Sequence, residues 1–381
     1  MEASPGKLKI MTVVGTRPEI IRLAATIKRL DNYVNHVLVH TGQNYDYELN
    51  EIFFEDLGLR KPDHFLAADT TSLGTVLGSI LSSIERILLR EKPDAMLVLG
   101  DTNSSISAVM ARRMRVPVYH MEAGNRCFDE NVPEEVNRRL IDHVADYNLV
   151  YTEHARRNLL DEGIHPSRIL LTGSPMREVL DANRSAINAS NVLERERLRP
   201  QEYFLVSLHR EENVDSHDRL GDILHALNRL ADTYNLPVLI STHPRTRQRL
   251  ASQPPELKNG LHFHPPFGFN DYVKLQQSAK LVLSDSGTIS EESLILGFPA
   301  VTLRDSTERP ESMDAGGIIT TGPGAAAILD SVQMTLQQVE EDGFSSPPGE
   351  YQIRDTSRRT VNFIRSTVHS HAMRAAIRAT L

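Results

Sequence analysis

The chain has 381 residues, of which 40% are hydrophobic and 24% charged, and its formal net charge is -8. This length suits two domains, and the composition is that of a globular protein rather than a disordered one. The negative charge disfavours nucleic acid and anionic membranes as partners, so an anionic ligand has to be bound by local arginines, histidines and helix N-termini.

The opening segment and the cysteine content indicate the compartment. A single cysteine, Cys127, has no partner for an intrachain disulfide. The opening MEASPGKLKI lacks a signal-peptide pattern, and no apolar run reaches the roughly 18 residues of a membrane span. We therefore expect a cytoplasmic protein with no membrane association.

Short apolar runs alternate with amphipathic stretches along the whole chain. In the first half, strands are predicted over residues 7–14, 36–41, 95–100, 116–121, 147–152 and 168–175. After the polar segment DANRSAINAS, further strands are predicted over residues 203–209, 238–242, 261–265, 281–286 and 299–303. Strands of this length alternating with helices are typical of parallel sheets.

The two series predict an α/β protein with two doubly wound Rossmann-like domains facing a cleft. We expect one domain to span residues 1–180, together with a C-terminal helix over about 356–381, and the other to span 181–355. In such sheets, ligands bind at the carboxyl ends of strands, so the residues that follow each strand are the candidates for a site.

The first strand is followed by VVGTRPE, in which Arg17 offers a guanidinium fork and Pro18 suits the first helical position. An ordinary helix start with a surface arginine explains this segment equally well. Two later strands each end near an acid, Asp101 in GDTNSS and Glu122 in HMEAGNR. Neighbouring carboxylates cannot both ionise freely in a dry site, so one becomes a usable acid or base, unless both are merely loop acids.

The segment VPEEVNRRLIDHV has a simple helical explanation. Glu134 and Glu135 suit a helix N-terminus, and both form i,i+4 pairs, with Arg138 and Arg139. The predicted buried face consists of Val136, Leu140, Ile141 and Val144. Local chemistry alone therefore favours a solvated charged face here.

Cationic and small residues follow the strands of the second half. His209 and Arg210 can donate to a diphosphate, and STHPRTR repeats the pattern with His243; surface histidines are the alternative. In SDSGTISEES, small residues at a helix start suit phosphate oxygens, and Glu292 suits ribose hydroxyls, although a capping box gives the same pattern. The chain has no P-loop lysine, H-E-x-x-H or G-x-S-x-G motif, and no metal site is expected.

Taken together and in order, these motifs resemble the non-hydrolysing UDP-N-acetylglucosamine 2-epimerase family. The matching segments are GTRPE, TGQNYDYEL, GDTNSS, MEAG, PEEVNR, TGSP, HREEN, SDSGTISEE and RDSTERPE. The variants HMEAGNRCFD and TGSPMREVL look more like one branch, which converts UDP-2-acetamido-2,6-dideoxy-L-talose to UDP-N-acetyl-L-fucosamine for surface polysaccharides.

The resemblance implies a glycosyltransferase-B-like fold and a homodimer. It implies that C2 of a UDP-2-acetamido sugar is inverted by elimination of UDP to a 2-acetamidoglycal and re-addition, with no metal and no redox cofactor. The residues then divide between catalytic carboxylates in the first domain and a UDP site in the second.

The family's site residues carry over position by position. The catalytic positions match Asp101, Glu122, Glu134 and His209. The substrate-binding positions, joined with the strand-end candidates, are Arg17, Arg22, Arg138, Arg210, His243, Ser286, Gly287, Thr288, Glu292 and Arg309. The resemblance thus overturns the helical explanation of Glu134 and Arg138. At Arg22 many members carry lysine, and arginine suits charge stabilisation rather than proton transfer.

Three functions compete on this evidence. A UDP-sugar 2-epimerase, acting on the fucosamine precursor or on UDP-N-acetylglucosamine, explains both the acids and the diphosphate site. A glycosyltransferase would share the nucleotide half but needs an acceptor. A nucleotide-sugar-binding regulator would bind without exchanging a proton.

Overall fold

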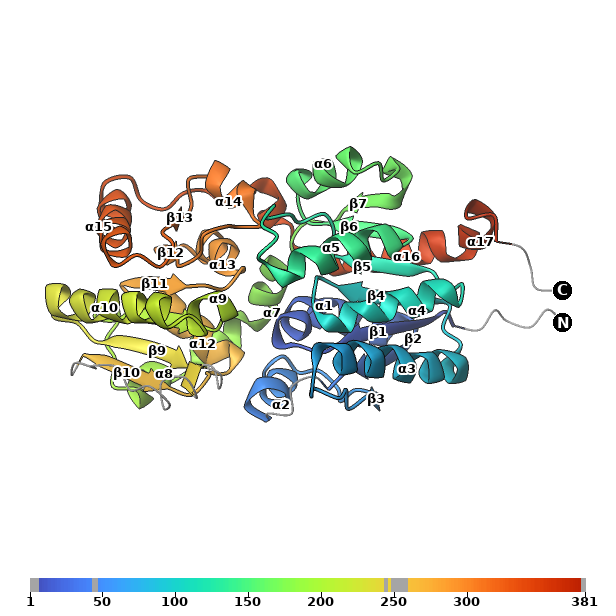
Figure 1. Ribbon diagram of the computed structural model, residues 1–381, viewed down its shortest axis with the longest axis horizontal. Coiled ribbons are helices and arrows are strands. Elements are labelled where there is room, and N and C mark those ends of the chain that lie inside the picture. Colours follow the sequence, from blue (N-terminus) through green and yellow to red (C-terminus); the bar gives the residue numbers. More distant parts are fainter. Residues whose placement is uncertain (1–6, 43–46, 243–245, 248–259, 378–381) are drawn as a thin grey trace. The chain divides into compact units, whose positions relative to one another are not determined.

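The computed structural model describes residues 7–42, 47–242, 246–247 and 260–377. The chain divides into two compact units (Figure 1), unit 1 with Met1–Ala182 and Gln352–Leu381 and unit 2 with Asn183–Tyr351. Each unit carries a parallel sheet with helices on its faces, which confirms the predicted α/β class.

The described part of unit 1 contains a seven-stranded sheet with the order β3-β2-β1-β4-β5-β6-β7. Its strands are β1 Lys9–Val14, β2 Asn35–His40, β3 His64–Phe65, β4 Ala95–Leu99, β5 Val118–Met121, β6 Tyr147–Val150 and β7 Ile169–Leu171. Its helices are α1 Arg17–Tyr33, α2 Tyr47–Asp56, α3 Leu73–Glu91, η1 Asn103–Ile106, α4 Ser107–Arg113, α5 Pro133–Val144, α6 Glu153–Asp161, η2 Pro166–Arg168, α16 Thr356–Thr367, η4 Val368–Ser370 and α17 His371–Arg374. Helix α7, Met176–Ala189, continues into unit 2.

The strand order of unit 1 reverses at β1 and β4. The chain builds outward from β1 through β2 to β3, and then returns to place β4 on the other side of β1. All five residues of β4 are buried, because helices cover both faces of the sheet. Loops diverge at such a reversal, and the resulting crevice is where open α/β sheets bind ligands.

The described part of unit 2 repeats this plan with a six-stranded sheet in the order β10-β9-β8-β11-β12-β13. Its strands are β8 Phe204–Leu208, β9 Val238–Thr242, β10 Leu261–His264, β11 Leu281–Ser284, β12 Ala300–Thr302 and β13 Ile319–Thr320. Its helices are α8 Val192–Arg195, α9 Glu211–Val214, α10 His217–Tyr234, α12 Phe269–Ser278, α13 Ile289–Leu296, α14 Pro310–Asp314, α15 Ala325–Asp342 and η3 Gly349–Gln352. The order reverses at β8 and β11.

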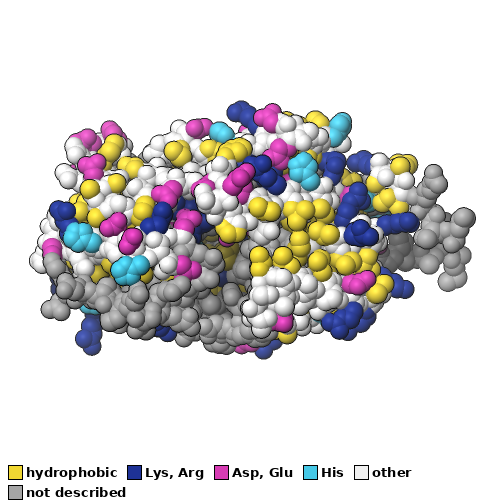
Figure 2. Space-filling view, viewed as in Figure 1, with side chains coloured by type: hydrophobic (Ala, Val, Ile, Leu, Met, Phe, Trp, Pro, Cys, Tyr) yellow, Lys and Arg dark blue, Asp and Glu magenta, His cyan; other side chains and the backbone are white. Residues whose placement is uncertain are grey.

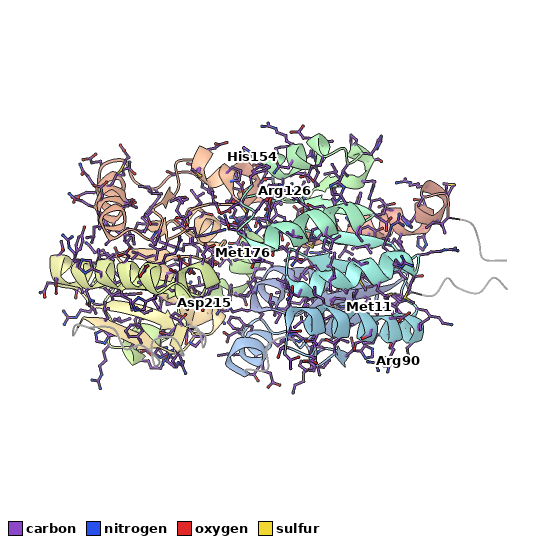
Figure 3. All side chains as sticks on the ribbon, in the orientation of Figure 1. Met11, Arg90, Arg126, His154, Met176 and Asp215 are labelled. Carbon is purple, nitrogen blue, oxygen red and sulfur yellow. The ribbon has the colours of Figure 1, made fainter. Side chains whose placement is uncertain are left out.

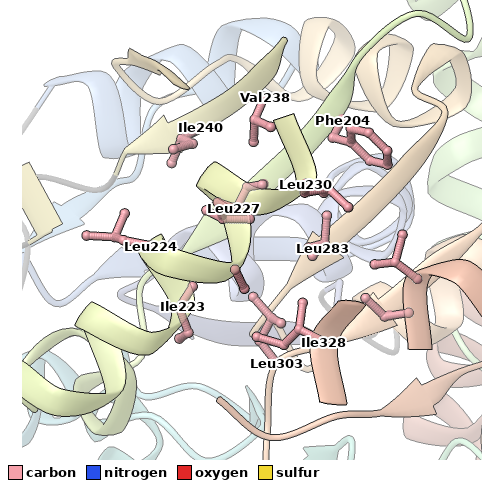
Figure 4. Close-up of a cluster of buried hydrophobic side chains, with 14 of the residues drawn as sticks. Phe204, Ile223, Leu224, Leu227, Leu230, Val238, Ile240, Leu283, Leu303 and Ile328 are labelled. Carbon is pink, nitrogen blue, oxygen red and sulfur yellow. The ribbon is translucent and has the colours of Figure 1, made fainter. Parts of the chain in front are cut away.

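Helix α10 carries the apolar stripe that forms the core of unit 2 (Figure 4). Ile223, Leu227 and Leu230 are fully buried against Phe204 of β8 and Ile328 of α15. Ser216 caps the N-terminus of the helix, where its hydroxyl accepts a hydrogen bond from the Arg219 amide. Truncating one of these buried leucines to alanine typically costs about 2–5 kcal/mol, so this core holds the strand ends of the unit in place.

The C-terminal tail, for which one helix over about 356–381 was expected, forms α16 over Thr356–Thr367 and then the short helices η4 and α17, all in unit 1. Arg29 of α1 donates Nε to Ser357 Oγ at 2.8 Å, and Tyr119 of β5 lies 2.7 Å from Thr367 Oγ1. Helix α16 therefore packs on α1, the helix that follows the first strand, and on β5.

The edge strands β3 and β13 were not expected from the sequence. Each has only two residues, so neither strand contains an apolar run long enough to be predicted from the sequence. None of the helices within the described ranges is long and apolar enough to span a bilayer.

Candidate active site

Two acidic residues lie at the carboxyl ends of neighbouring strands in unit 1, as predicted. Asp101 follows β4 and Glu122 follows β5, and these strands pair in register. Glu122 has a φ of 65°, in the left-handed region that non-glycine residues seldom adopt. Such backbone strain costs on the order of 1–3 kcal/mol and gathers at functional sites, so it supports a functional role for this carboxylate.

Arginine partners orient both acids. Arg138 donates Nε to Asp101 Oδ2 at 2.7 Å, and Arg22 forms an ion pair from Nη1 to Glu122 Oε2. A β-carbon at Gly100 would lie 3.4 Å from Glu122 Oε2, so the glutamate lies directly beside the residue that precedes Asp101. The structure thus brings Asp101, Glu122, Arg22 and Arg138 together, and places Arg22 against a carboxylate rather than free for a ligand.

Helix α5 differs from the prediction. Val136 is 66% and Leu140 41% exposed, so the predicted apolar face is wrong at these two positions. The buried face instead carries Glu135, Arg138, Ile141 and Asp142. Charged groups face inward here because each has a partner: Arg138 pairs with Asp101, Glu135 with Arg138, and Asp142 with His120. Helix periodicity does not reveal these partners.

The predicted ion pair between Glu134 and Arg138 is also wrong. Arg138 instead donates Nη1 to Glu135 Oε2 at 2.9 Å, while the half-exposed Glu134 makes no hydrogen bond or ion pair with the described residues. Burial raises the pKa of Glu135, but hydrogen bonds from Cys127 and Arg138 outweigh it and hold that pKa below its usual value. Glu135 is therefore a structural anion that holds Arg138 in place, a role that Glu134 does not share.

Glu19, in GTRPE, was not predicted from the sequence to be part of the site. Its Oε2 accepts hydrogen bonds from the Gly15 amide at 2.9 Å and the Thr16 hydroxyl at 2.8 Å, and its Oε1 accepts one from Ser104. It thus joins the loop after β1 to the loop after β4, at the reversal of strand order. Burial raises the pKa of Glu19 to about 7, because the hydroxyls and the amide only partly compensate. Arg17, two residues before it, lies with its guanidinium 5.6 Å from the centre of the Phe53 ring.

A second buried network contacts the loops that carry Asp101 and Glu122. His120 lies with Nε2 2.9 Å from Gly100 O and Nδ1 2.9 Å from Asp142 Oδ1. Asp142 also accepts from the Gly124 amide and pairs with Arg126, 2.7 Å away. The Arg126 guanidinium in turn donates to Glu162, which follows α6. Figure 3 labels Arg126 among the side chains of unit 1. Sequence offered no signal for this network beyond the type of the residues.

In unit 2, the HREEN segment follows β8 and is held by Asp285 at the end of β11. The amides of His209 and Arg210 donate to its carboxylate at 3.0–3.1 Å, and Asn213 Nδ2 donates at 3.2 Å. Arg210 also donates Nε to the Asp285 carbonyl at 3.0 Å. The structure therefore brings His209 and Arg210 to the end of β11, where Ser286 begins the next predicted segment.

The SDSGT segment forms the turn between β11 and α13. Ser286 Oγ lies 3.0 Å from Thr288 Oγ1, and any side chain at Gly287 would collide with the Glu308 carboxylate. This close approach explains why glycine occupies the turn. Beneath it, the buried Arg309 donates Nε to Gly287 O at 2.9 Å.

The remaining predicted contacts are placed as follows. Glu292 of α13 accepts a hydrogen bond from Gln276 Nε2 at 2.5 Å. His243 lies outside the described residues. Over the ranges that the structure describes, no three His, Cys, Asp or Glu residues gather in a way that could hold a metal ion.

Two parallel sheets of this topology, each with its polar groups at the strand ends where the order reverses, define an α/β protein of the glycosyltransferase-B-like class. The model of the family described as UDP-N-acetylglucosamine 2-epimerase matches residues 28–365. The chain belongs to that family, and its members are isomerases.

Several named proteins are similar to this chain over most of its length. A UDP-N-acetylglucosamine 2-epimerase of Methanocaldococcus jannaschii is 36% identical over 343 residues, covering 87% of this chain and 93% of that protein. A UDP-2,3-diacetamido-2,3-dideoxy-D-glucuronate 2-epimerase of Pseudomonas aeruginosa is 36% identical, covering 88% and 95%. The solved structure of a UDP-N-acetylglucosamine 2-epimerase from Rickettsia bellii superposes with a TM-score of 0.89 at 42% identity, covering 96% and 98%.

Proposed function

We propose that this protein inverts C2 of a UDP-2-acetamido sugar by eliminating UDP to a 2-acetamidoglycal and adding it back. The observation that carries the proposal is the pair Asp101 and Glu122 at neighbouring strand ends, each held by a guanidinium, with Glu122 in a strained backbone conformation. Inversion requires one group to remove the C2 proton and another to return a proton on the opposite face.

Glu134 is the third carboxylate of this proposal. Asp101 and Glu122 are each oriented by an arginine, whereas Glu134 is half-exposed and has no ion pair among the described residues, and we assign it to contact with the substrate. General acid–base help contributes about 10²–10⁴-fold. Because the C2 proton is only weakly acidic, the rest of the acceleration has to come from stabilising the departing diphosphate.

Unit 2 supplies the groups for that diphosphate. His209 and Arg210 lie at the end of β8, beside the SDSGT turn that follows β11, and we assign the diphosphate to these two side chains and to the small residues of the turn. We assign Arg309 to support of this turn rather than to direct contact, since its side chain is only 1% exposed.

Isotope exchange tests the proposal. Incubation with UDP-N-acetylglucosamine or a related UDP-2-acetamido sugar in D₂O, without acceptor, should place deuterium at C2 and yield the C2 epimer by NMR. Asp101→Asn and Glu122→Gln should each lower turnover at least about a hundredfold. Transfer to an acceptor, or binding of the sugar nucleotide without exchange, would contradict the proposal.

The sugar itself is a further part of the proposal. The named relatives act on UDP-N-acetylglucosamine and on a diacetamido glucuronate, so 2-acetamido sugars are the substrate class to test first. The segments HMEAGNRCFD and TGSPMREVL favour UDP-2-acetamido-2,6-dideoxy-L-talose as a second candidate. Comparing kcat/KM across a panel of these sugars decides between them.

We also propose that the protein is a homodimer formed through α3 and α5. Leu73 and Leu89 of α3 and Val136 and Leu140 of α5 are exposed, and α4 packs between these helices. Figure 2 shows an apolar patch over this part of the surface. Homodimer interfaces are more apolar than ordinary surface, so a second copy of the chain is the occupant that fits this face.

A further inference from the structure

Asp285 is a fully buried carboxylate at the end of β11, and it contacts the residue that is expected to bind the diphosphate. Its Oδ1 lies 2.9 Å from His209 Nδ1, and the same carboxylate accepts hydrogen bonds from the amides of His209 and Arg210. Burial raises the pKa of Asp285, but the interaction with His209 and the hydrogen bonds from Arg210 and Asn213 outweigh it and hold that pKa below its usual value. Asp285 is therefore an anion inside the protein.

This contact decides which ring nitrogen of His209 is available. Nδ1 faces Asp285 Oδ1 in an ion pair, without the alignment of a hydrogen bond. Because an ionised carboxylate acts only as an acceptor, we assign a hydrogen to Nδ1. Nδ1 is buried, so the exposed 30% of the side chain lies on its other atoms. Nε2 is then the nitrogen that can meet a ligand.

We propose that Asp285 is a positioning residue that fixes the ring of His209 with Nδ1 inward, so that Nε2 donates to a phosphate oxygen of UDP. The inference rests on the proposed function, because UDP is the ligand that it assigns to His209. A carboxylate behind an imidazole fixes its tautomer and orientation and stabilises its protonated form. The positive charge then faces the negative charge that grows on the departing diphosphate.

Asp285 contacts the His209 ring from the end of β11, and arginines lie around this pair. Arg210 packs beside the pair, with Nη2 3.9 Å from Glu308, and Glu308 in turn pairs with Arg304 at 2.6 Å. Arg219 donates to Asn213 Oδ1 on the other side. Glu308 is thus engaged by arginines, and the cations around the pair would repel an imidazolium that lacked Asp285.

The same carboxylate also joins the two loops of the site. β8 and β11 are the strands at which the order of the unit 2 sheet reverses, so their following loops diverge. By accepting the His209 and Arg210 amides, Asp285 holds the β8 loop against the β11 loop, next to Ser286. A single substitution at Asp285 should therefore disturb UDP binding without touching UDP.

The test compares Asp285→Asn with Asp271→Asn, a matched change at an acid that pairs with Arg195 on the surface of unit 2. In the full chain, UDP affinity is measured by calorimetry, turnover by NMR, and the imidazole tautomer by long-range ¹H–¹⁵N spectra at alkaline pH. We expect the wild-type protein to hold the hydrogen of His209 on Nδ1, and the D285N variant to release it to Nε2. UDP binding should weaken roughly tenfold, as for loss of one charge-assisted contact, and turnover should fall about a hundredfold.

D271N should match the wild-type protein in all three measurements. A wild-type Nε2–H tautomer, or UDP affinity and turnover in D285N equal to those of D271N, would overturn the inference. The wild-type spectrum decides the orientation of the ring even if D285N does not fold. If no UDP sugar exchanges its C2 proton while the tautomer and UDP affinity behave as expected, the proposed epimerisation fails and the role of Asp285 stands.

Discussion

At the scale of single residues, the site depends on carboxylates that differ in what surrounds them. Glu19 is buried among hydroxyls and an amide, whereas Glu135 and Asp285 are buried beside cations. The first environment raises a pKa and the second lowers it, although the residue types are the same. Sequence position at a strand end identifies candidates, but only the contacts say which acid can hold a proton near neutral pH.

The raised pKa of Glu19 predicts a stability that falls as pH rises. Between pH 4.5 and about 7 the folded state keeps a proton that the unfolded chain releases, so the free energy of unfolding should drop across this window by about 3 kcal/mol. Glu19→Gln removes this contribution. We therefore expect the free energy of unfolding of E19Q, relative to that of the wild-type protein, to be higher at pH 8 than at pH 5. Urea denaturation at the two pH values measures this difference.

The comparison with E19Q isolates this group from others that titrate nearby. Burial lowers the pKa of His371, which makes stability rise with pH in part of the same window. Glu153, a first-turn glutamate whose side chain is 42% exposed, serves as the control through E153Q. If E19Q and E153Q follow the same pH dependence as the wild-type protein, Glu19 does not hold the proton.

At the scale of elements, α5 shows how a site can override helix periodicity. The helix places two neighbouring glutamates in different environments: Glu134 is half-exposed and pairs with none of the residues that the structure describes, and Glu135 is buried against Arg138. The family resemblance implies that Glu134 is catalytic, whereas the geometry indicates that Glu135 holds Arg138 in place. The two positions therefore predict separable defects.

Glu134→Gln should lower turnover by about a hundredfold while shifting the free energy of unfolding by less than about 0.5 kcal/mol. Glu135→Gln removes one partner of a buried ion pair and should destabilise the protein by about 3 kcal/mol. Initial rates and urea denaturation on both variants check this. A stable E135Q combined with an unstable E134Q would reverse the assignment.

At the scale of the whole molecule, the two units share a topology and a placement of polar groups. In each, the strand order reverses beside the first strand, and a buried acid joins the two loops that diverge there: Glu19 in unit 1 and Asp285 in unit 2. The solvent-exposed apolar side chains on α3 and α5 belong to this scale too, since only a partner can cover them.

Replacing both Val136 and Leu140 with aspartate should convert the dimer to a monomer. Dimer formation would then bury two carboxylates in an apolar interface without a partner of opposite charge. Sedimentation velocity measures the state, with Met334→Asp as the control at an exposed apolar side chain of unit 2. A wild-type monomer, or a dimer that survives the double substitution, would rule out this face as the interface.

The sequence by itself determined the class of fold and most strands, because strands buried on both faces need continuous apolar runs such as AMLVL in β4. It also placed Asp101, Glu122 and His209, because the carboxyl ends of such strands are marked by the run that precedes them. Only the tertiary structure decided which groups surround these residues. Glu19 meets Ser104 across 85 positions and Asp285 meets His209 across 76, and no local pattern encodes the contacts that set the pKa and the orientation of a buried charge.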